Sequence, residues 1–174
     1  DKDESARQMV TEEVWEIMSA NGKLPWNRIT DFHAEGYEFL SNFYEARVEY
    51  GGLAFGSSEA AFQAQKCITE EEKAQFMEFG PGKSKGIGRG IKLRPDWESV
   101  KVGIMEEIVR AKFTQHRELA EKLLATGDKV LVEGNHWGDT CWGVDTRTGQ
   151  GENYLGKILM KIREELKLSA RQNV

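Results

Sequence analysis

The segment RVEYGGLAFGSSEAAFQAQK, residues 47–66, contains a hairpin signal followed directly by a helix signal. Gly51-Gly52 separates two short runs, residues 47–50 and 53–55, and glycine readily adopts the positive φ angles of a tight hairpin turn. Ser57-Ser58 then supplies hydroxyl groups of the kind that cap helix N-termini. The segment therefore predicts a β-hairpin that leads into a helix ending near Ile68.

Four side chains of this helix are expected to share one face. Glu59, Phe62, Gln63 and Lys66 are three, four and seven residues apart, so at ~3.6 residues per turn they form one stripe. A core face would be better served by apolar residues, because a buried carboxylate, amide and amine lose their hydration. The stripe is either a solvated salt-bridge face or the wall of a polar cleft. We expect Glu59 and Lys66 to point into one cleft.

The composition excludes several classes of protein. The 174 residues fit one domain, and a net charge of −5 with a pI near 5.4 argues against a general nucleic-acid binder but permits a pocket for one nucleotide. No apolar run approaches the ~18 residues of a membrane span, and no signal-peptide pattern opens the chain. Two lone cysteines, Cys67 and Cys141, indicate a reducing compartment, so we expect a cytoplasmic protein. The three histidines lack zinc spacing, and we expect no metal.

The rest of the chain predicts helices with a few short strands. Expected helices are residues 4–20, a helix capped by Thr69, 96–113 capped by Asp96, 117–125 and 153–167. Expected strands are residues 29–32 and 129–133, and we expect residues 80–90 and 136–150 to be irregular. The predicted fold class is α+β: a single, mostly helical domain at residues 29–174 with a short hairpin, preceded by an N-terminal helical extension at residues 1–28.

Residues 80–90 are rich in glycine and carry three cations. A P-loop is excluded, because Met77 stands where the pattern requires glycine and a helix is expected where it requires a strand. Lys83, Lys85 and Arg89 remain, surrounded by backbone amides that glycine leaves accessible. This combination indicates either a phosphate site or an ordinary basic loop.

Several other polar and aromatic residues have two interpretations. Asp139 is either an Asx-turn residue or a catalytic carboxylate, and Trp142 is either a plug of the core or a stacking surface for a base. Trp97 is expected to be buried on one side of its helix. Asn42 and Phe43 suit a pocket rim or a turn, and Asn153 suits a helix start.

Taken in order, these motifs resemble the NADAR family. The resemblance runs from about residue 29 to residue 166 and rests on short motifs in a fixed sequence: Phe39-Leu-Ser-Asn-Phe-Tyr44, Ser58-Glu59, Gln63-Ala-Gln-Lys66, Gly88-Arg89, Trp97 with Met105, Lys112-Phe113, Leu124-Ala-Thr-Gly127, Leu131-Val-Glu133, Asp139-x-x-Trp142-Gly143, Gly151-x-Asn153-x-x-Gly156 and Leu159-Met160-x-x-Arg163. It implies a small α+β domain with a pocket for a phosphorylated ribosyl-base compound, and hydrolysis of an N-glycosidic bond.

The resemblance also implies which residues act. The expected catalytic residues are Glu59, Lys66 and Asp139, with the roles of the two carboxylates left open and with either water or the Lys66 amine as the nucleophile. The expected substrate-binding residues are Asn42, Phe43, Gln63, Lys83, Lys85, Arg89, Trp97, Trp142, Gly143 and Asn153.

The partner implied by the resemblance is a small nucleotide-like molecule. Riboflavin-biosynthesis ribosylamino-pyrimidine intermediates and ADP-ribosylated guanine in nucleic acid are the two candidate substrates, and no cofactor is expected. The rival function is a non-catalytic module that binds NAD or ADP-ribosyl groups. The sequence leaves the oligomeric state open.

Overall fold

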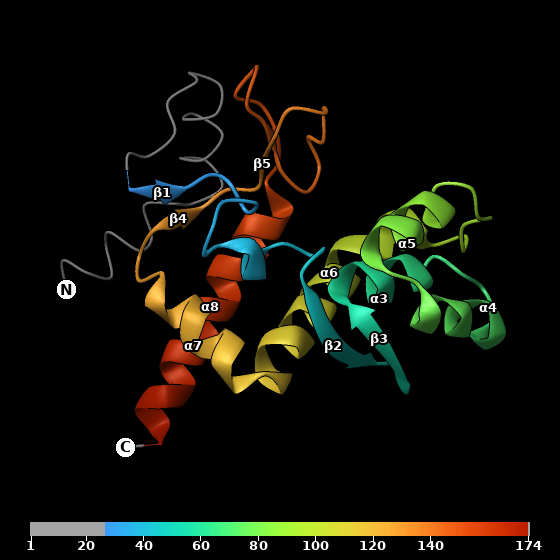
Figure 1. The fold of residues 1–174 in the computed structure, drawn as a ribbon, viewed down its shortest axis with the longest axis horizontal. Coiled ribbons are helices and arrows are strands. Elements are labelled where there is room, and N and C mark those ends of the chain that lie inside the picture. Colours follow the sequence, from blue (N-terminus) through green and yellow to red (C-terminus); the bar gives the residue numbers. More distant parts are fainter. Residues whose placement is uncertain (1–26, 174) are drawn as a thin grey trace.

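The long helix α6 (Trp97–Gln115) has other elements packed on opposite sides of it in this computed structural model, which describes residues 27–173. It contacts helices α3 (Ser58–Ala64), α7 (Arg117–Ala125) and α8 (Tyr154–Gln172), and also strand β2 (Glu45–Tyr50). Figure 1 shows the hairpin and the shorter helices on one side of α6 and helices α7 and α8 on the other. The core therefore forms around one helix rather than around a large sheet.

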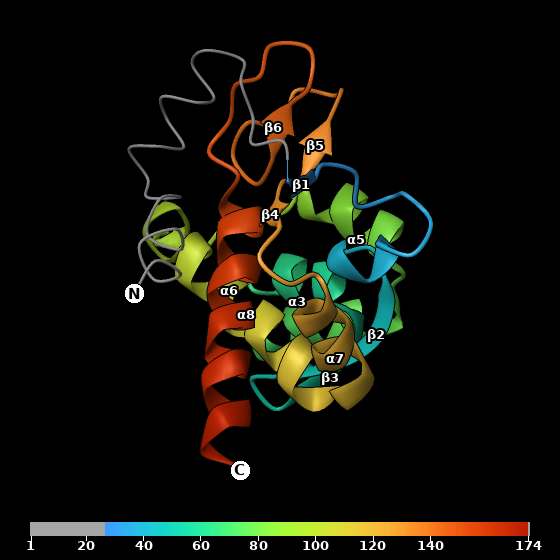
Figure 2. The ribbon, with the colours of Figure 1, turned by 90° about the vertical axis from the view of Figure 1, so that its left-hand side faces the viewer.

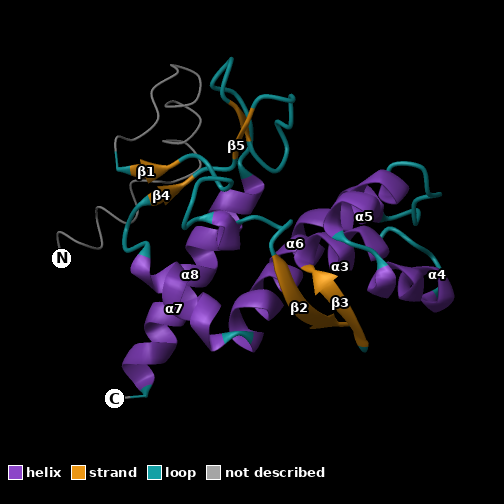
Figure 3. Ribbon diagram, in the orientation of Figure 1, coloured by secondary structure: helices purple, strands orange, loops and turns teal. Residues whose placement is uncertain are grey.

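Three small sheets accompany the helices (Figure 3). Strand β2 pairs antiparallel with β3 (Leu53–Ser57), while β1 (Arg28–Ile29) pairs parallel with β4 (Val130–Leu131), and β5 (Gly134–Asn135) pairs parallel with β6 (Val144–Asp145). The other elements within residues 27–173 are α4 (Glu70–Gln75), α5 (Pro81–Gly88) and the short 3₁₀ helices η1 (Glu38–Leu40) and η2 (Phe76–Glu78). The α+β prediction is confirmed.

The hairpin and two of the predicted helices form as expected. Both turn glycines have positive φ, +60° at Gly51 and +83° at Gly52, which is what the tight turn requires. Thr69 caps α4 by accepting a hydrogen bond from the Glu72 amide at 3.2 Å. Helix α7 has the predicted bounds, and Gly127 follows it at a φ of +66°. Local turn and cap chemistry decides each of these features.

Helix α3 ends at Ala64, four residues earlier than predicted. Hydrogen bonds that reach back three residues tighten its end: the amides of Gln65, Lys66 and Cys67 donate to the carbonyls of Phe62, Gln63 and Ala64. Lys66 therefore lies in the turn that follows the helix.

The prediction that residues 80–90 are irregular is wrong, because Pro81–Gly88 form helix α5. Pro81 occupies the first turn, where its fixed φ is suited to a helix start. Gly88 is buried against α3, and a Cβ atom there would lie 2.0 Å from Gln63 Oε1. The close contact between α3 and α5 thus accounts for this glycine.

Several other element boundaries also differ from the predicted ones. Asp96 precedes α6 without capping it, because its carboxylate accepts two hydrogen bonds from Arg94, at 2.6 and 2.9 Å. Strands β1 and β4 are shorter than predicted, and the region predicted as the loop 136–150 contains β6. Helix α8 continues past the predicted end at residue 167 to Gln172. The predicted helix at residues 4–20, and nearly all of the predicted extension 1–28, lie outside the described residues.

Figure 2 views the molecule from the side and shows α8 running from the middle of the molecule down to the carboxyl end, with the β5–β6 pair above it. The carboxyl end of the chain, on α8, therefore lies at the opposite end of the molecule from the β5–β6 loops. Those loops and the segment after β1 bound the site that is described next.

Candidate active site

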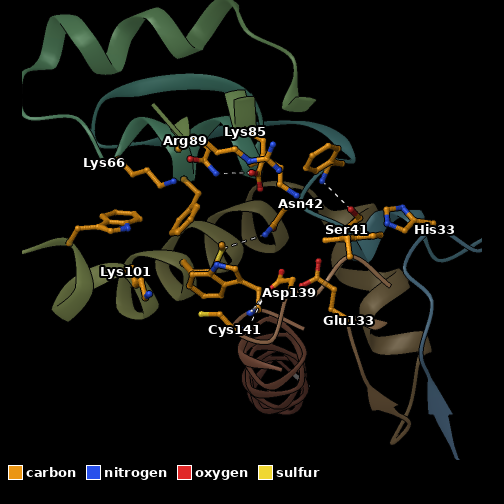
Figure 4. Close-up of a pocket in the computed structure, with 18 residues that line it drawn as sticks. His33, Ser41, Asn42, Lys66, Lys85, Arg89, Lys101, Glu133, Asp139 and Cys141 are labelled. Atoms are coloured by element: carbon orange, nitrogen blue, oxygen red, sulfur yellow. Dashed lines mark hydrogen bonds between the residues drawn. The ribbon is translucent and has the colours of Figure 1, made fainter. Parts of the chain in front are cut away.

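A pocket of about 740 Å³ lies between helices α3, α5 and α6 and the loops that follow β1 and β5. It is lined by His33, Ser41, Asn42, Phe43, Glu59, Phe62, Gln63, Lys66, Lys85, Arg89, Trp97, Lys101, Met105, Glu133, Trp137, Asp139, Cys141 and Trp142. Ligand pockets are commonly of this size, and they combine apolar walls with a few convergent polar groups. Figure 4 shows Lys66, Lys85 and Arg89 on one wall, with Glu133 and Asp139 on the wall opposite.

The start of α3 is fixed by hydrogen bonds that determine where Glu59 points. The Ser57 hydroxyl accepts from the Ala60 amide at 3.1 Å, which caps the helix. The Glu59 amide donates to the Asn42 carbonyl at 3.1 Å, and the Ser58 hydroxyl donates to the Asn42 side-chain oxygen at 2.8 Å. Asn42 thus ties the segment after η1 to the first turn of α3.

Glu59 is a buried carboxylate with one side-chain hydrogen bond, donated by Gln63 Nε2 at 2.9 Å. Burial raises the pKa of Glu59 above its usual range, while the Gln63 hydrogen bond and the charges of Lys85 and Lys66 oppose that rise. The predicted polar stripe is therefore a pocket wall and not a solvated face.

Lys66 enters the same pocket from the turn after α3. Its ammonium nitrogen donates to the Gly88 carbonyl at 3.3 Å and lies 6.0 Å from the centroid of the Trp97 ring. Burial lowers the pKa of Lys66, the nearby Glu59 opposes this, and the charges of Arg89 and Lys101 lower the pKa further. A lowered pKa makes an amine more available as a nucleophile at neutral pH.

Asp139 reaches the pocket from the loop after β5. Its Oδ1 accepts hydrogen bonds from the amides of Cys141 and Trp142, both at 3.0 Å, so the Asx-turn interpretation is correct. The Asn135 side chain also holds the Asp139 backbone, accepting from its amide at 3.0 Å and donating to its carbonyl at 2.8 Å. Asp139 is therefore held rigidly opposite α3, and its catalytic role stays a prediction.

An aromatic group covers one side of the pocket. The Phe62 ring lies 5.1 Å from Trp97 and 5.2 Å from Trp142, measured between centroids. Trp97 is buried and Trp142 is half-buried, so each contributes both to packing and to the pocket surface. Such surfaces suit the flat face of a base.

A second aromatic group lies at the rim. The Lys85 ammonium is 5.6 Å from the centroid of Phe43 and 5.7 Å from that of Trp137, and both rings are exposed. His33 lies beside Trp137, with 6.1 Å between the ring centroids. The rim therefore combines a cation with aromatic faces from three separate segments of the chain.

Three predicted binding residues do not line the pocket. Lys83 is exposed on another face of α5, with its ammonium 4.5 Å from the Phe79 ring. Gly143 is buried, and a Cβ there would lie 2.1 Å from the Glu133 carbonyl oxygen. Asn153 is fully buried, and its amide group bonds the backbone at Leu131 and Glu133. The last two residues support the wall behind Glu133 and do not face the cavity.

Glu133 is the most informative pocket residue that the prediction missed. Its Oε2 is buried, and within residues 27–173 it has no hydrogen-bond partner. Burial raises the pKa of Glu133 to about 8; the negative charges of Asp139 and Glu59 add to the rise, and Lys85 opposes it. The sequence position of Glu133 could have indicated a site residue, because Glu133 directly follows the apolar run of residues 130–132, where a carboxylate is unexpected.

Seven other residues of the pocket lining were also absent from the expected site residues. They are His33, Ser41, Phe62, Lys101, Met105, Trp137 and Cys141. Between residues 27 and 173, no group of three acidic, cysteine or histidine side chains is placed to hold a metal ion.

The site occurs within a region that matches a known family. The NADAR domain model matches residues 30–167. The N-glycosidase YbiA of Escherichia coli K12 is 38% identical over 136 residues, which cover 76% of this chain and 84% of that protein. A Vibrio vulnificus protein named as a riboflavin biosynthesis protein is 40% identical over 144 residues, and the match spans 38% of its length.

A solved structure has the same fold. The NMR structure of E. coli YbiA aligns with a TM-score of 0.73 at 35% identity and covers 84% of this chain and 89% of that one. The similarity in sequence and in structure extends over the elements that build the pocket. The chain belongs to the NADAR domain family.

Proposed function

We propose that this chain is an N-glycosidase that hydrolyses the bond between a ribose, phosphorylated or linked to ADP, and a base. The observation that carries the proposal is the pocket itself, which is lined by Glu59 from α3 and by Asp139 from the loop after β5, together with four cations and three tryptophans. A ribosyl-base compound has parts that match each of these groups.

The chemistry of the bond explains the carboxylates. As the N-glycosidic bond breaks, positive charge builds on the anomeric carbon and negative charge builds on the departing base. A carboxylate fixed near the sugar stabilises the first charge, and a proton donor near the base neutralises the second. Glu59 is fixed by its helix cap and by Gln63, which suits the first task.

Lys66 provides a second route to the same products. Its amine can attack the anomeric carbon, after which ring opening gives a Schiff base that water hydrolyses. The lowered pKa of Lys66 supports this route. On the other route, water attacks directly and Lys66 acts as a cation beside the sugar or its phosphate.

The phosphate contacts are assigned to Lys85, Arg89 and Lys101. They replace the predicted group of Lys83, Lys85 and Arg89, because Lys83 faces away from the pocket and Lys101 lines it. Trp142 and Trp97 provide the surface for the base.

The relatives guide the choice of substrate. Because the Vibrio vulnificus relative is named as a riboflavin biosynthesis protein, we take ribosylamino-pyrimidine phosphates as the first candidate substrates. ADP-ribosylated guanine is the second candidate. A cytoplasmic location is part of the proposal, in keeping with the free thiols of Cys67 and Cys141. No helix between residues 27 and 173 has the length and hydropathy of a membrane span.

The rival function is a module that binds nucleotides without cleaving them. Such a module would need the cations and the aromatic rings but not carboxylates whose burial raises the pKa of Glu59 and of Glu133. Strongly perturbed carboxyl groups in a pocket favour catalysis.

The experiment that tests the proposal is incubation of the protein with a ribosylamino-pyrimidine phosphate or with ADP-ribosylated guanine. Released base is measured by chromatography. Release that depends on Glu59 supports the proposal. Tight binding of both compounds without release of either base would favour the binding module.

A further inference from the structure

Three carboxylates share the pocket, and Glu133 differs from the other two in its hydrogen bonds. Glu59 accepts from the Gln63 side chain, and Asp139 accepts from two backbone amides. Glu133 Oε2 is buried and accepts none from the described residues. An ionised Glu133 would therefore have a buried charged oxygen without a hydrogen-bond donor, which is more costly than a buried neutral acid.

The negative charges around Glu133 also favour its protonated form. Glu59 faces it from α3 and Asp139 from the loop after β5, while Lys85 on α5 is the cation that opposes them. His33 lines the pocket from the segment after β1, and the other titratable side chains in the lining are Lys66, Arg89, Lys101 and Cys141. When carboxylates share one site, mutual repulsion keeps at least one of them protonated, and the one with the fewest donors is the natural holder of that proton.

The backbone on both sides of Glu133 is held in place. Its amide donates to Asn153 Oδ1 at 2.9 Å, and its carbonyl accepts from the Val144 amide at 2.8 Å. Gly143 packs so closely on that carbonyl that no side chain fits there. These contacts set Glu133 on the same wall as Asp139, across the pocket from Lys66, Lys85 and Arg89 (Figure 4).

From this geometry we propose, on the basis of the proposed N-glycosidase function, that Glu133 is the general acid that protonates the departing base. Trp142, which provides the base surface, belongs to the Asp139 loop and directly precedes Gly143, the residue that packs on the Glu133 carbonyl. Glu59 comes from α3 and lies close enough to Lys66 and Lys85 for their charges to lower its pKa, so it is left to face the sugar.

The proton and electron transfers follow from this placement. The bond between C1′ and the base nitrogen breaks, its electron pair stays on that nitrogen, and the nitrogen takes the proton of the Glu133 carboxylic acid. On the direct route, water adds to C1′ through its oxygen and gives one proton to the Glu59 carboxylate. Exchange with solvent then returns a proton to Glu133 and removes the one on Glu59. On the Lys66 route, the amine replaces water in the first addition and the Glu133 step is unchanged.

The first test uses the wild-type protein and needs no substrate. Carbon-13 NMR of the glutamate side-chain carboxyls, recorded between about pH 5 and pH 10, is expected to show a resonance that titrates near pH 8. That resonance should be missing in Glu133→Gln and present in Glu59→Gln. If every glutamate carboxyl titrates below about pH 6, the proposal is overturned, whatever the activity.

The second test measures turnover. Glu133→Gln keeps the size of the side chain but has no acidic proton, so kcat should fall by roughly 10²–10⁴ while KM changes little. The decline of wild-type kcat on the alkaline side, expected near pH 8, should disappear in the variant. Glu118→Gln, an exposed position on α7, is the matched control and should behave as wild type.

The two proposals fail in different ways. If the wild-type protein releases no base, the N-glycosidase function fails, while the NMR titration still tests the protonation state of Glu133. If the wild type is active and Glu133→Gln keeps a kcat within a factor of about three, or keeps the alkaline decline, the general-acid assignment fails and the N-glycosidase function stands.

Discussion

Replacing Gly88 with alanine is expected to disturb catalysis through Gln63 and Glu59. A Cβ at Gly88 would lie 2.0 Å from Gln63 Oε1 and 2.7 Å from Gln63 Cδ, so the amide has to retreat toward an ordinary contact of 3.4 Å or more. That amide donates the 2.9 Å hydrogen bond to Glu59. Because the atoms in the way belong to the end of a flexible side chain, the helix itself can stay in place.

The magnitudes follow from three contributions. Alanine for glycine in a helix stabilises by roughly 0.5–1 kcal/mol, whereas overpacking a tight contact costs about 1–3 kcal/mol. The lost hydrogen bond, made to a charged group, is worth roughly 1.5–3 kcal/mol. The two costs exceed the gain, so we expect Gly88→Ala to be less stable than wild type by roughly 1.5–5.5 kcal/mol. Its kcat should fall by on the order of 10²-fold, as for a misplaced catalytic group.

The same helix provides a matched control. Gly86 is exposed and a Cβ there would meet no atom within 4 Å, so Gly86→Ala should raise the free energy of unfolding and leave kcat unchanged. The assays are urea denaturation and the rate of base release against pH. Without the Gln63 hydrogen bond the pKa of Glu59 rises, so the acidic limb of the pH profile should move to higher pH in Gly88→Ala alone. Equal rates and equal acidic limbs in the two variants would refute this reasoning.

Three further predictions concern residues elsewhere in the site and its support. Lys85→Ala should raise the KM for a phosphorylated substrate by roughly 10-fold or more, as expected for the loss of a charge-assisted contact. Lys83→Ala on the same helix is the control and should leave the KM unchanged. Equal effects of the two variants in steady-state kinetics would contradict the phosphate assignment. Lys112→Met should lower the free energy of unfolding by roughly 2–4 kcal/mol in urea denaturation. The reason is that the buried carbonyls of Phe39 and Ser41 lose the ammonium that bonds them at 2.6 and 2.9 Å. A variant as stable as wild type would contradict this prediction. Folding raises the pKa of Glu133 to about 8, so the native state holds a proton that the unfolded state releases at lower pH, and this group makes the free energy of unfolding fall as pH rises toward 8. Glu133→Gln should therefore gain stability relative to wild type between about pH 6 and pH 9. A difference in the free energy of unfolding between variant and wild type that does not change over this range would contradict the pKa shift.

The parts of the fold that depend on local chemistry were predictable from the sequence. The hairpin turn needs Gly51-Gly52, the start of α4 needs Thr69, and the end of α7 needs Gly127. Helix α5 was not predictable in this way, because its glycines disfavour a helix and the contact between Gly88 and Gln63 is long-range. Tertiary packing overrides local propensity at that position.

The candidate site also contains residues that the sequence predicts and residues that only the fold reveals. The spacing of Glu59, Gln63 and Lys66 along one helix face was enough to predict a shared cleft, and all three line it. Lys83 was placed wrongly because an irregular segment has no faces, whereas on α5 it points away from Lys85. Glu133 was missed because its burial is created by elements distant in the sequence.

The most direct test of the central claim compares Glu59→Gln with wild type in substrate binding and in base release. The variant keeps the size of the side chain but loses the charge that faces the anomeric carbon. Calorimetry should give nearly equal dissociation constants for the intact substrate, because its phosphate and base contact other residues. Base release in a single turnover should fall by on the order of 10²–10³ in Glu59→Gln. Base release at the wild-type rate would show that Glu59 is structural and would contradict the account.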